Sequence, residues 1–399
     1  MKNEQIVVTG MGVVSAIGNS VAEILHSIKN STCPIGEIKH LDTINKYPVA
    51  EVALSDAEMK QMLNLPEDAE HTRTTLMGIL AVQQAIESLS DEEKRTKRVA
   101  FINGTTVGGM EKSEKHFLDF FETDEYDKYI KVHDCGSSSE AIADYFGCFS
   151  HVSTISTACS SGANSVIMGC RLIENDLADI AVVGGSECLT KFHINGFSTL
   201  LILDNEICKP FDKNRAGLNL GEGAAYIVLQ KASDVKPQDK GKILCKVSGY
   251  SNTCDAYHQT ASSPEGEGAY LAMQNALINS NLKPQDIDYI SAHGTGTPNN
   301  DLSEGISIQR IFGDNIPPVS STKSLTGHTT SASGAIEAII SILALNEGFI
   351  PPNYNFKEKM PELNFAPQKE IESRELKNVL SNSFGFGGNN TSIIFSLYN

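Results

Sequence analysis

The sequence lacks the features that would place it in a membrane or in a secretory pathway. It has no window of about 20 apolar residues, the length that a membrane-spanning helix needs. Residues 1–20 contain no basic region followed by an unbroken apolar stretch, so no signal peptide is indicated. We therefore expect a cytoplasmic protein with no membrane partner.

Paired cysteine motifs and an excess of basic charge are missing as well. The nine cysteines are irregularly spaced and include no CxxC pair, which argues against a disulfide framework or a zinc site. The chain has 32 basic and 49 acidic residues, and its formal net charge is −17. Because this charge repels phosphate groups, we expect no nucleic-acid partner.

What the sequence does contain is a regular alternation of strand-like and helix-like segments. The chain has 399 residues and is 40% hydrophobic, enough for a large core and for two or three structural units. Apolar β-type runs indicate a buried, mostly parallel sheet and occur at residues 5–16, 98–104, 152–157, 179–185, 224–230, 242–250, 288–294 and 391–398. Apolar residues at helical spacing occupy 74–90, 161–176, 266–281 and 333–348. The pattern predicts an α/β fold.

One polar, turn-rich segment divides this alternation. It covers residues 230–242, and strands and helices alternate on both sides of it. We predict two halves, residues 1–240 and residues 241–399. A repeat at the level of single residues is not evident.

A single cysteine lies where a predicted strand turns into a predicted helix. The β-type run 152–157 is followed by small residues from 158 to 162. A thiol there would meet unpaired backbone N–H groups and the positive end of the helix dipole, both of which favour the thiolate. Cys159 is therefore placed as a nucleophile, and a buried small residue in a tight turn is the structural alternative.

Three other segments could complete a site around this cysteine. His293 lies in AHGTGTP and His328 in KSLTGHTTSASGA, and both segments contain glycines that allow a ligand to approach the backbone. In SNSFGFGGNN, three glycines around Phe386 form a turn that could present backbone N–H groups, as an oxyanion hole requires. Each feature alone is more typical of ordinary structure, but together they suggest a catalytic group.

Seven segments, taken in order, resemble the signatures of one enzyme family. They are VVTGMGVVSAIG, STACSSGA, KPFDKNRAGLNLGEGAA, DAYHQT, AHGTGTPNNDLSE, STKSLTGHTTSASGA and SNSFGFGGNN. This combination resembles the β-ketoacyl-acyl-carrier-protein synthases of the elongating type, which use one cysteine and two histidines. A dinucleotide-binding loop is a poorer match, because Ser15 stands where GxGxxG requires its third glycine.

The resemblance implies a fold and a reaction. The fold is that of the thiolases, with two similar α/β halves in a five-layered α-β-α-β-α sandwich, and the protein is expected to be a homodimer. The nucleophile lies in residues 1–240 and both histidines lie in residues 241–399. The reaction is the decarboxylative condensation of an acyl thioester with malonyl-acyl carrier protein in fatty acid elongation. No cofactor is bound, because the phosphopantetheine of acyl carrier protein delivers the substrates.

The resemblance also implies a role for each residue of the catalytic group. Cys159 takes the acyl chain, and His293 and His328 promote decarboxylation of the malonyl unit and stabilise the enolate. Lys323 organises the second histidine. Phe386 is a gate whose backbone N–H joins that of Cys159 in the oxyanion hole.

Substrate and ion contacts follow from the same comparison. Thr295 and Thr297 bind the phosphopantetheine arm, and Val107 and Phe384 contact the acyl chain. A site for Na⁺ or K⁺ is implied at Glu304, Glu337 and Ser381. The asparagine that is common beside this ion site is replaced by Ser291.

The pathway and the docking surface stay open at the level of sequence. The alternative to fatty acid elongation is a specialised polyene or polyketide pathway, in which the chain could be the active half of a heterodimer with a chain-length partner. Carrier proteins of this kind are acidic, so an acidic enzyme needs a local basic patch to bind them. Arg73, Lys128 and Lys131 are the candidates.

Overall fold

A computed structural model describes residues 4–398, so the outermost positions of the predicted halves, 1–3 and 399, lie outside it. Ten strands form one sheet in the order β3-β2-β4-β5-β1-β6-β12-β11-β7-β8. Their bounds are β1 Ile6–Ser15, β2 Val99–Gly104, β3 His151–Ile155, β4 Ile180–Glu187, β5 Gly223–Lys231, β6 Cys245–Cys254, β7 Tyr289–Ser291, β8 Val319–Ser320, β11 Asn378–Gly385 and β12 Asn389–Ser396. A separate pair joins β9 (Phe349–Ile350) to β10 (Glu372–Ser373).

The sheet repeats one pattern twice. The first half has the order β3-β2-β4-β5-β1, and the second half, read from its outer end, has the matching order β8-β7-β11-β12-β6. In each half the outer three strands are parallel, and the two that follow are antiparallel to their neighbours. Strands β1 and β6 join the halves. The halves therefore share one topology, although their sequences show no repeat.

The prediction of a mostly parallel sheet is wrong. Four of the nine neighbouring strand pairs are parallel and five are antiparallel. Strands such as β4 and β5 are buried along almost their whole length although they run antiparallel to each other. Burial on both faces produces an unbroken apolar run whichever way the neighbouring strand runs, so the run does not reveal strand direction.

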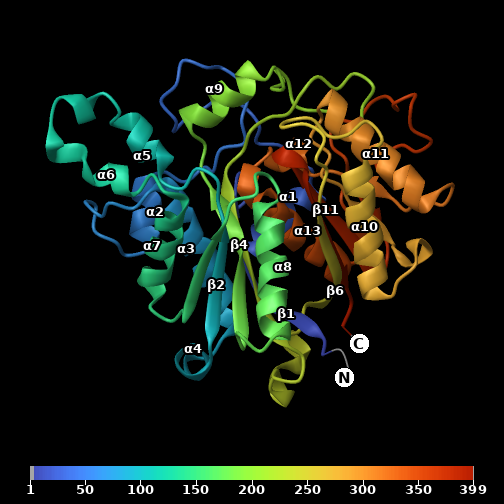
Figure 1. Cartoon of the computed structure of the whole chain (residues 1–399), viewed down its shortest axis with the longest axis horizontal. Coiled ribbons are helices and arrows are strands. Elements are labelled where there is room, and N and C mark those ends of the chain that lie inside the picture. Colours follow the sequence, from blue (N-terminus) through green and yellow to red (C-terminus); the bar gives the residue numbers. More distant parts are fainter. Residues whose placement is uncertain (1–3, 399) are drawn as a thin grey trace.

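Helices form three layers around the two halves of the sheet (Figure 1). On the outer face of the first half lie α3 (Arg73–Ala85) and α7 (Cys135–Phe146). Between the halves lie α8 (Ser161–Glu174) and α13 (Ser333–Glu347), and outside the second half lie α10 (Glu267–Ser280) and α11 (Pro298–Phe312). The predicted five-layered α-β-α-β-α fold is confirmed.

The two central helices approach each other closely at their N-terminal ends. A Cβ atom built on Gly334 of α13 would lie 2.9 Å from the Cβ of Ala163 in α8, and one on Gly162 would lie 2.9 Å from the carbonyl oxygen of Ser331. Only glycine fits at such distances. The segments that precede the two helices, which contain Cys159 and His328, are thereby brought together.

The remaining helices are shorter or lie at the periphery. They are α1 Val21–Lys29, α2 Asp56–Met62, α4 Asp91–Thr96, α5 Met110–Lys115, α6 Lys128–Lys131, α9 Lys191–Thr199 and α12 Lys323–Thr326. Within residues 4–398, every helix is too short or too polar to span a bilayer.

Candidate active site

Cys159 lies in a tight turn between β3 and α8, as the sequence predicts for its surroundings. Ala158 has a φ of +52°, in the left-handed region, and α8 begins at Ser161. The Ser161 hydroxyl accepts a hydrogen bond from the Thr157 N–H at 2.9 Å and donates one to the Ala158 carbonyl at 2.6 Å. This turn fixes the thiol at the N-terminal end of α8.

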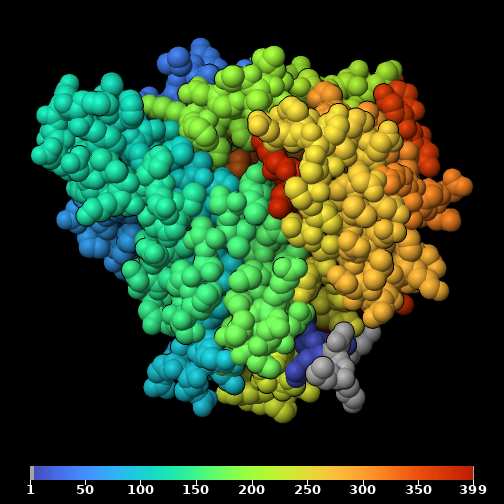
Figure 2. All heavy atoms as spheres, viewed as in Figure 1, coloured from blue at the N-terminus to red at the C-terminus, as the bar shows by residue number. Residues whose placement is uncertain are grey.

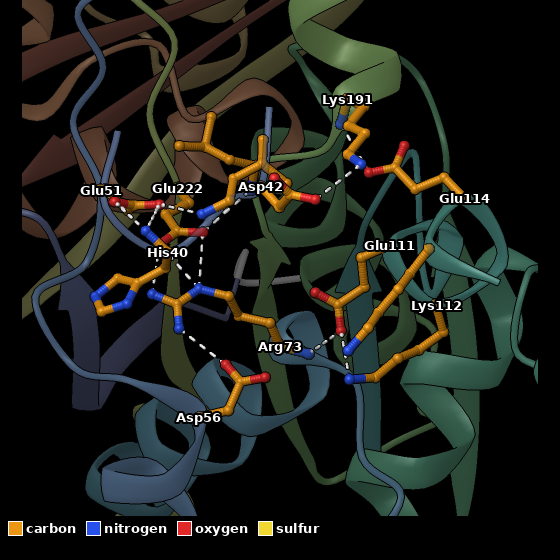
Figure 3. A pocket seen from close by; sticks show the side chains of 13 residues that line it. His40, Asp42, Glu51, Asp56, Arg73, Glu111, Lys112, Glu114, Lys191 and Glu222 are labelled. Carbon is orange, nitrogen blue, oxygen red and sulfur yellow. Dashed lines mark hydrogen bonds and ion pairs between the residues drawn. The ribbon is translucent and has the colours of Figure 1, made fainter. Parts of the chain in front are cut away.

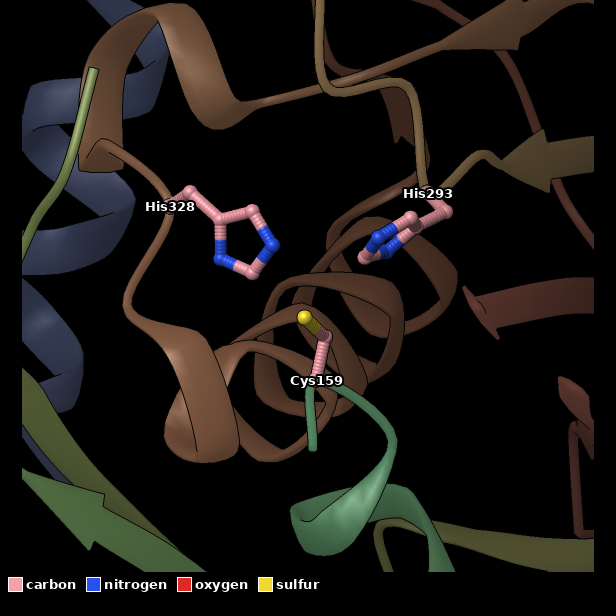
Figure 4. A group of neighbouring side chains, drawn as sticks. All are labelled: Cys159, His293 and His328. Carbon is pink, nitrogen blue, oxygen red and sulfur yellow. The ribbon is translucent and has the colours of Figure 1, made fainter. Parts of the chain in front are cut away.

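The two histidines meet the thiol from the other half of the molecule (Figure 4). One donor atom from each of Cys159, His293 and His328 lies within 4.8 Å of the other two, and all three residues are buried. The imidazole rings are nearly perpendicular, at 87°, and their centroids are 5.4 Å apart. His293 follows β7, and His328 lies in the segment between α12 and α13.

Hydrogen bonds define the tautomer of His328. Its Nδ1 accepts from the backbone N–H of Thr330 at 3.0 Å and lies 3.2 Å from the Ser333 hydroxyl. Burial, followed by the charge of Lys323, lowers the pKa of His328 well below its ordinary value, so the ring is neutral at pH 7. Because Nδ1 is an acceptor, the single ring proton is on Nε2.

His293 is held in the same tautomer by a different partner. The buried ammonium of Lys323 lies 3.3 Å from His293 Nδ1 and donates to the His293 carbonyl oxygen at 2.6 Å. An ammonium can only donate, so Nδ1 is the acceptor and Nε2 carries the proton. Burial and the charge of Lys323 lower the pKa of His293 well below its ordinary value.

This arrangement corrects the contact implied for Lys323. The resemblance assigns the lysine to the second histidine, but its hydrogen bonds go to His293 and to Glu337 of α13. The reason is geometric: Lys323 begins α12, next to the loop after β7, whereas His328 takes its donors from its own segment. The charge of Lys323 still contributes to the lowered pKa of His328.

The thiol of Cys159 is protonated in the resting site. Burial raises its pKa to about 11, although Lys323, the Phe386 N–H and its own N–H act in the opposite direction. The backbone N–H groups at the start of the helix favour the thiolate, as the sequence predicts, but burial outweighs them. A buried sulfur loses more solvation than these donors restore.

Phe386 lies in a short turn, where its backbone N–H faces the Cys159 sulfur. Its ring stacks on Phe197 of α9 at a centroid distance of 5.7 Å, and Phe197 also meets the His328 ring at 6.5 Å. Phe384 lies on the other side of the site, 6.1 Å from the His293 ring. The sequence did not predict Phe197, because the residues of α9 do not show an extended periodic pattern of apolar side chains.

The turn at Phe386 lies at the protein surface. Gly387 is exposed, and its N–H donates to the Gln259 carbonyl at 2.7 Å. In Figure 2 the C-terminal segment, in red, is visible in a hollow between the chain near residue 200 and the chain near residue 260. The turn therefore connects the buried cysteine with the exterior.

Glu304 and Glu337 support the His293 side of the site. Glu304 of α11 accepts from the backbone N–H groups of His293 and Gly294 at 2.9 and 2.8 Å. Glu337 binds Lys323 through Oε1, while its buried Oε2 has no hydrogen-bond partner. Burial raises the pKa of both carboxyl groups to about 7.

A monovalent cation would satisfy the free oxygen of Glu337. Ser381 of β11 is also buried. Both Glu304 oxygens already accept backbone N–H groups, so Glu304 has less capacity for an ion. The ion site therefore stays a prediction.

The two threonines predicted for the phosphopantetheine arm are neighbours in the loop that follows His293. Their hydroxyl groups lie 2.9 Å apart, and both residues are buried. Thr297 also caps the N-terminus of α11.

A buried glutamate that the sequence did not predict connects Val107 to the segment that contains His328. Glu187, at the end of β4, accepts from the Val107 N–H at 3.1 Å and from the Ser331 hydroxyl at 2.5 Å. Val107 is buried in the loop after β2. The only signal for Glu187 in the sequence is an acidic residue directly after the run IAVVGGS.

Two of the three basic residues suggested for carrier docking, Arg73 and Lys128, form ion pairs within the chain. Arg73 is buried in a charged cavity of about 340 Å³, where it binds Glu222 at 2.6 Å and Asp56 at 2.9 Å (Figure 3). Arg73 is therefore a structural residue, and its proposed docking role is wrong. Lys128 is exposed but paired with Glu70, and Lys131 is exposed.

The side chains of Cys159, His293 and His328 lie close enough together to hold a metal. They are the only convergent group of three or more such side chains within residues 4–398. Binding a metal at Nε2 would move each ring proton to Nδ1, which faces the Thr330 N–H in His328 and the Lys323 ammonium in His293. The hydrogen bonds thus favour N–H groups that point at a substrate over metal ligands.

Comparisons with known proteins agree with this geometry. Residues 3–235 match the N-terminal domain of the β-ketoacyl synthases, and residues 244–357 match the C-terminal domain. The chain is 33% identical to 3-oxoacyl-[acyl-carrier-protein] synthase 2 of Synechocystis, covering 100% of this chain and 99% of the relative. The same enzyme of Coxiella burnetii is 32% identical, with 99% of both chains covered.

Two solved structures are similar over the whole chain. The ishigamide ketosynthase/chain length factor matches with a TM-score of 0.91 and 29% identity, covering 100% of both chains. The ketosynthase ApeO of Xenorhabdus doucetiae, in complex with its chain length factor ApeC, matches with a TM-score of 0.86 and 32% identity, covering 99% of this chain and 98% of the other.

Proposed function

This chain belongs to the β-ketoacyl synthase family, and we propose that Cys159, His293 and His328 carry out its reaction. The protein is a 3-oxoacyl-acyl-carrier-protein synthase that condenses an acyl thioester with malonyl-acyl carrier protein. The observation that carries the residue assignment is the convergence of one thiol and two imidazole Nε2–H groups in a buried site.

The first step is transfer of the acyl chain to Cys159. The sulfur attacks the thioester carbonyl, the carrier thiol leaves, and the proton of the Cys159 thiol ends on that thiol. Negative charge develops on the carbonyl oxygen during the attack. The backbone N–H groups of Cys159 and Phe386, which both act on the sulfur, supply the donors for this oxygen.

The second step forms the new carbon–carbon bond. The malonyl thioester loses carbon dioxide, and its electron pair forms an enolate without a strong base. The enolate oxygen receives hydrogen bonds from Nε2–H of His293 and of His328. Both rings are neutral, so each can donate this proton without first being protonated. The enolate carbon then attacks the acyl group on Cys159 and releases the sulfur as a thiolate, which takes up a proton from water to restore the resting thiol.

Further residues have supporting roles. Lys323 and Glu304 hold the His293 loop, and Thr295 and Thr297 bind the phosphopantetheine arm. Val107 and Phe384 contact the acyl chain. Na⁺ or K⁺ bound at Glu304, Glu337 and Ser381 would supply positive charge to these buried carboxylates.

The assignment is tested by separating the two steps. Incubation with acyl-carrier substrates should add one acyl group, detected by intact mass, and Cys159→Ala should abolish this addition. His293→Ala and His328→Ala should each retain acylation but lower malonyl decarboxylation by about 10²-fold or more, the effect of losing one such donor. An acylated Cys159→Ala protein, or loss of both steps together in the histidine variants, would contradict the assignment.

We propose a homodimer that works in fatty acid elongation in the cytoplasm. Strand β3 has a neighbouring strand on one side only within residues 4–398, and His151 and Val152 on it are exposed. Such an edge can pair with a second copy of itself.

The second candidate is the active half of a heterodimer in a polyene or polyketide pathway. It is favoured by the likeness to two ketosynthases whose structures include a chain length factor. The two candidates differ in the length and unsaturation of the acyl groups that Cys159 should accept. The acylation assay above, run with acyl-carrier substrates of different length and unsaturation, measures this preference.

A further inference from the structure

Asn389 accepts hydrogen bonds from two other segments through one side-chain oxygen. Its Oδ1 lies 2.7 Å from the Ser160 hydroxyl, 2.9 Å from Asn164 Nδ2 and 2.7 Å from Asn252 Nδ2. Ser160 directly follows Cys159, Asn164 is in the first turn of α8, and Asn252 is on β6. The first two donors thus belong to the segment that holds the thiol.

The orientation of these amide groups follows from their other partners. Asn164 Oδ1 accepts from the Thr391 hydroxyl at 2.8 Å, so Asn164 Nδ2 must face Asn389. Asn389 therefore presents its oxygen to three donors. Each donor also has an acceptor of its own: the Thr157 carbonyl for Ser160 at 2.7 Å, the Thr157 hydroxyl for Asn164 at 2.9 Å and the Thr391 hydroxyl for Asn252 at 2.9 Å. A side chain without an acceptor at position 389 would therefore leave these donors paired but would remove the bonds that attach Asn389 to them.

Asn389 is also fixed to the turn that contains Phe386. It is the first residue of β12 and pairs with Gly385, the last residue of β11, so that Phe386, Gly387 and Gly388 form the turn between them. Gly385 lies against the thiol segment as well, since a Cβ built on it would be 3.1 Å from the Cys159 nitrogen. Both ends of the turn are thus attached to the segment that holds Cys159.

We propose that Asn389 is a positioning residue that sets the Phe386 N–H against Cys159. Gly385 fixes one end of the turn by close packing, and Asn389 fixes the other end by hydrogen bonds. The distance between the two N–H donors of the oxyanion hole then depends on the Asn389 oxygen. This inference rests on the proposed function of those two N–H groups.

The test compares Asn389→Leu with Asn389→Asp. Leucine has a similar size but no acceptor, whereas aspartate keeps an oxygen for all three donors. Self-acylation of Cys159 by an acyl thioester is measured relative to its alkylation by iodoacetamide, which needs the thiolate but no oxyanion hole. This ratio cancels any change in the pKa of the thiol.

Asn389→Leu should lower the normalised acylation rate about 10- to 100-fold, below the 10²–10³-fold effect of removing a donor entirely. Malonyl decarboxylation should change by less than about 3-fold, because it uses the histidines rather than this hole. Asn389→Asp should acylate at least about 5-fold faster than Asn389→Leu on the same scale, because a kept acceptor preserves the hydrogen bonds between the turn and the thiol segment. Asn252→Ala is the matched control, because it removes the donor that is not attached to the thiol segment. Its normalised acylation rate should stay within about 3-fold of the wild-type rate.

Equal acylation by Asn389→Leu and the wild type would overturn the proposal. Equal losses in the leucine and aspartate variants, or equal losses of acylation and decarboxylation, would also overturn it. If Asn389→Leu does not fold, Ser160→Ala must show the same selective loss of acylation, and a wild-type rate in that variant would refute the role. Failure of the proposed function would look different, because Cys159 of the wild type would then remain unacylated.

Discussion

At the scale of single residues, the site is governed by burial more than by local charge. Burial raises the pKa of the Cys159 thiol to about 11, although the Lys323 ammonium lowers it. Burial is also the largest cause of the lowered pKa of both histidines, and there the ammonium acts in the same direction. The resting site is therefore neutral at its three reacting groups. Negative charge appears only during the reaction, where N–H donors are already in place.

This protonation state makes the reactivity of Cys159 strongly dependent on pH. With a thiol pKa of about 11, the thiolate fraction should rise about tenfold per unit between pH 7 and pH 10. The rate of alkylation by iodoacetamide at the peptide containing Cys159, followed by mass spectrometry, should rise accordingly. An ordinary thiol with a pKa of about 8.5 would level off near pH 9. A rate for Cys159 that levels off below pH 8 would contradict the raised pKa.

The sequence predicted which three side chains converge better than it predicted the contacts around them. Cys159, His293 and His328 lie in glycine-rich segments whose chemistry is visible one residue at a time. The partner of Lys323 and the role proposed for Asn389 depend on which segments lie side by side in space. Such contacts have no local signal in a single sequence.

At the scale of elements, long apolar runs were reliable and polar elements were missed. The runs at 161–176 and 333–348 correspond to α8 and α13. Strand β11 was missed because its central residues, Ser381, Asn382 and Ser383, are polar but buried. Asn382 is satisfied by Glu304 at 3.1 Å and by the Ser392 hydroxyl at 2.8 Å. A buried strand with internal hydrogen bonds of this kind does not look apolar in the sequence.

Two Gly→Ala substitutions, one at the crowded contact between α8 and α13 and one at an open position in α9, should change stability in opposite directions. Gly334→Ala should destabilise the protein by about 1–3 kcal/mol, because its Cβ would lie 2.6 Å from the Ser383 hydroxyl and 2.9 Å from Ala163. Gly196→Ala in α9 meets no atom within 4 Å and should stabilise it by up to about 1 kcal/mol. Urea unfolding of both variants measures these differences, and similar midpoints would show that the helix contact tolerates a methyl group.

At the scale of the whole molecule, the open edge at β3 predicts the oligomeric state. The purified protein should have a mass of twice 43.1 kDa by light scattering. Val152→Glu places a charge on the exposed edge and should shift the protein toward the monomer, because two copies would bring like charges together. Ile278→Glu, on exposed α10 outside the other half, is the matched control and should leave the dimer intact.

A wild-type protein of 43.1 kDa would contradict the homodimer and favour the chain-length partner. Dimers that persist in Val152→Glu would place the contact elsewhere on the surface.

The two ends of the duplicated sheet differ in a way that limits growth of an assembly. At the end formed by β8, the Val319 carbonyl accepts from the Gln368 N–H at 2.7 Å, so a neighbouring segment of the same chain already occupies that margin. Within residues 4–398, β3 is the end of the ten-stranded sheet that offers a free margin to another copy. A molecule with one unpaired edge strand forms a closed dimer, because the edge of each copy is covered by the other copy. A molecule with an unpaired edge at both ends of its sheet could add further copies and form fibres.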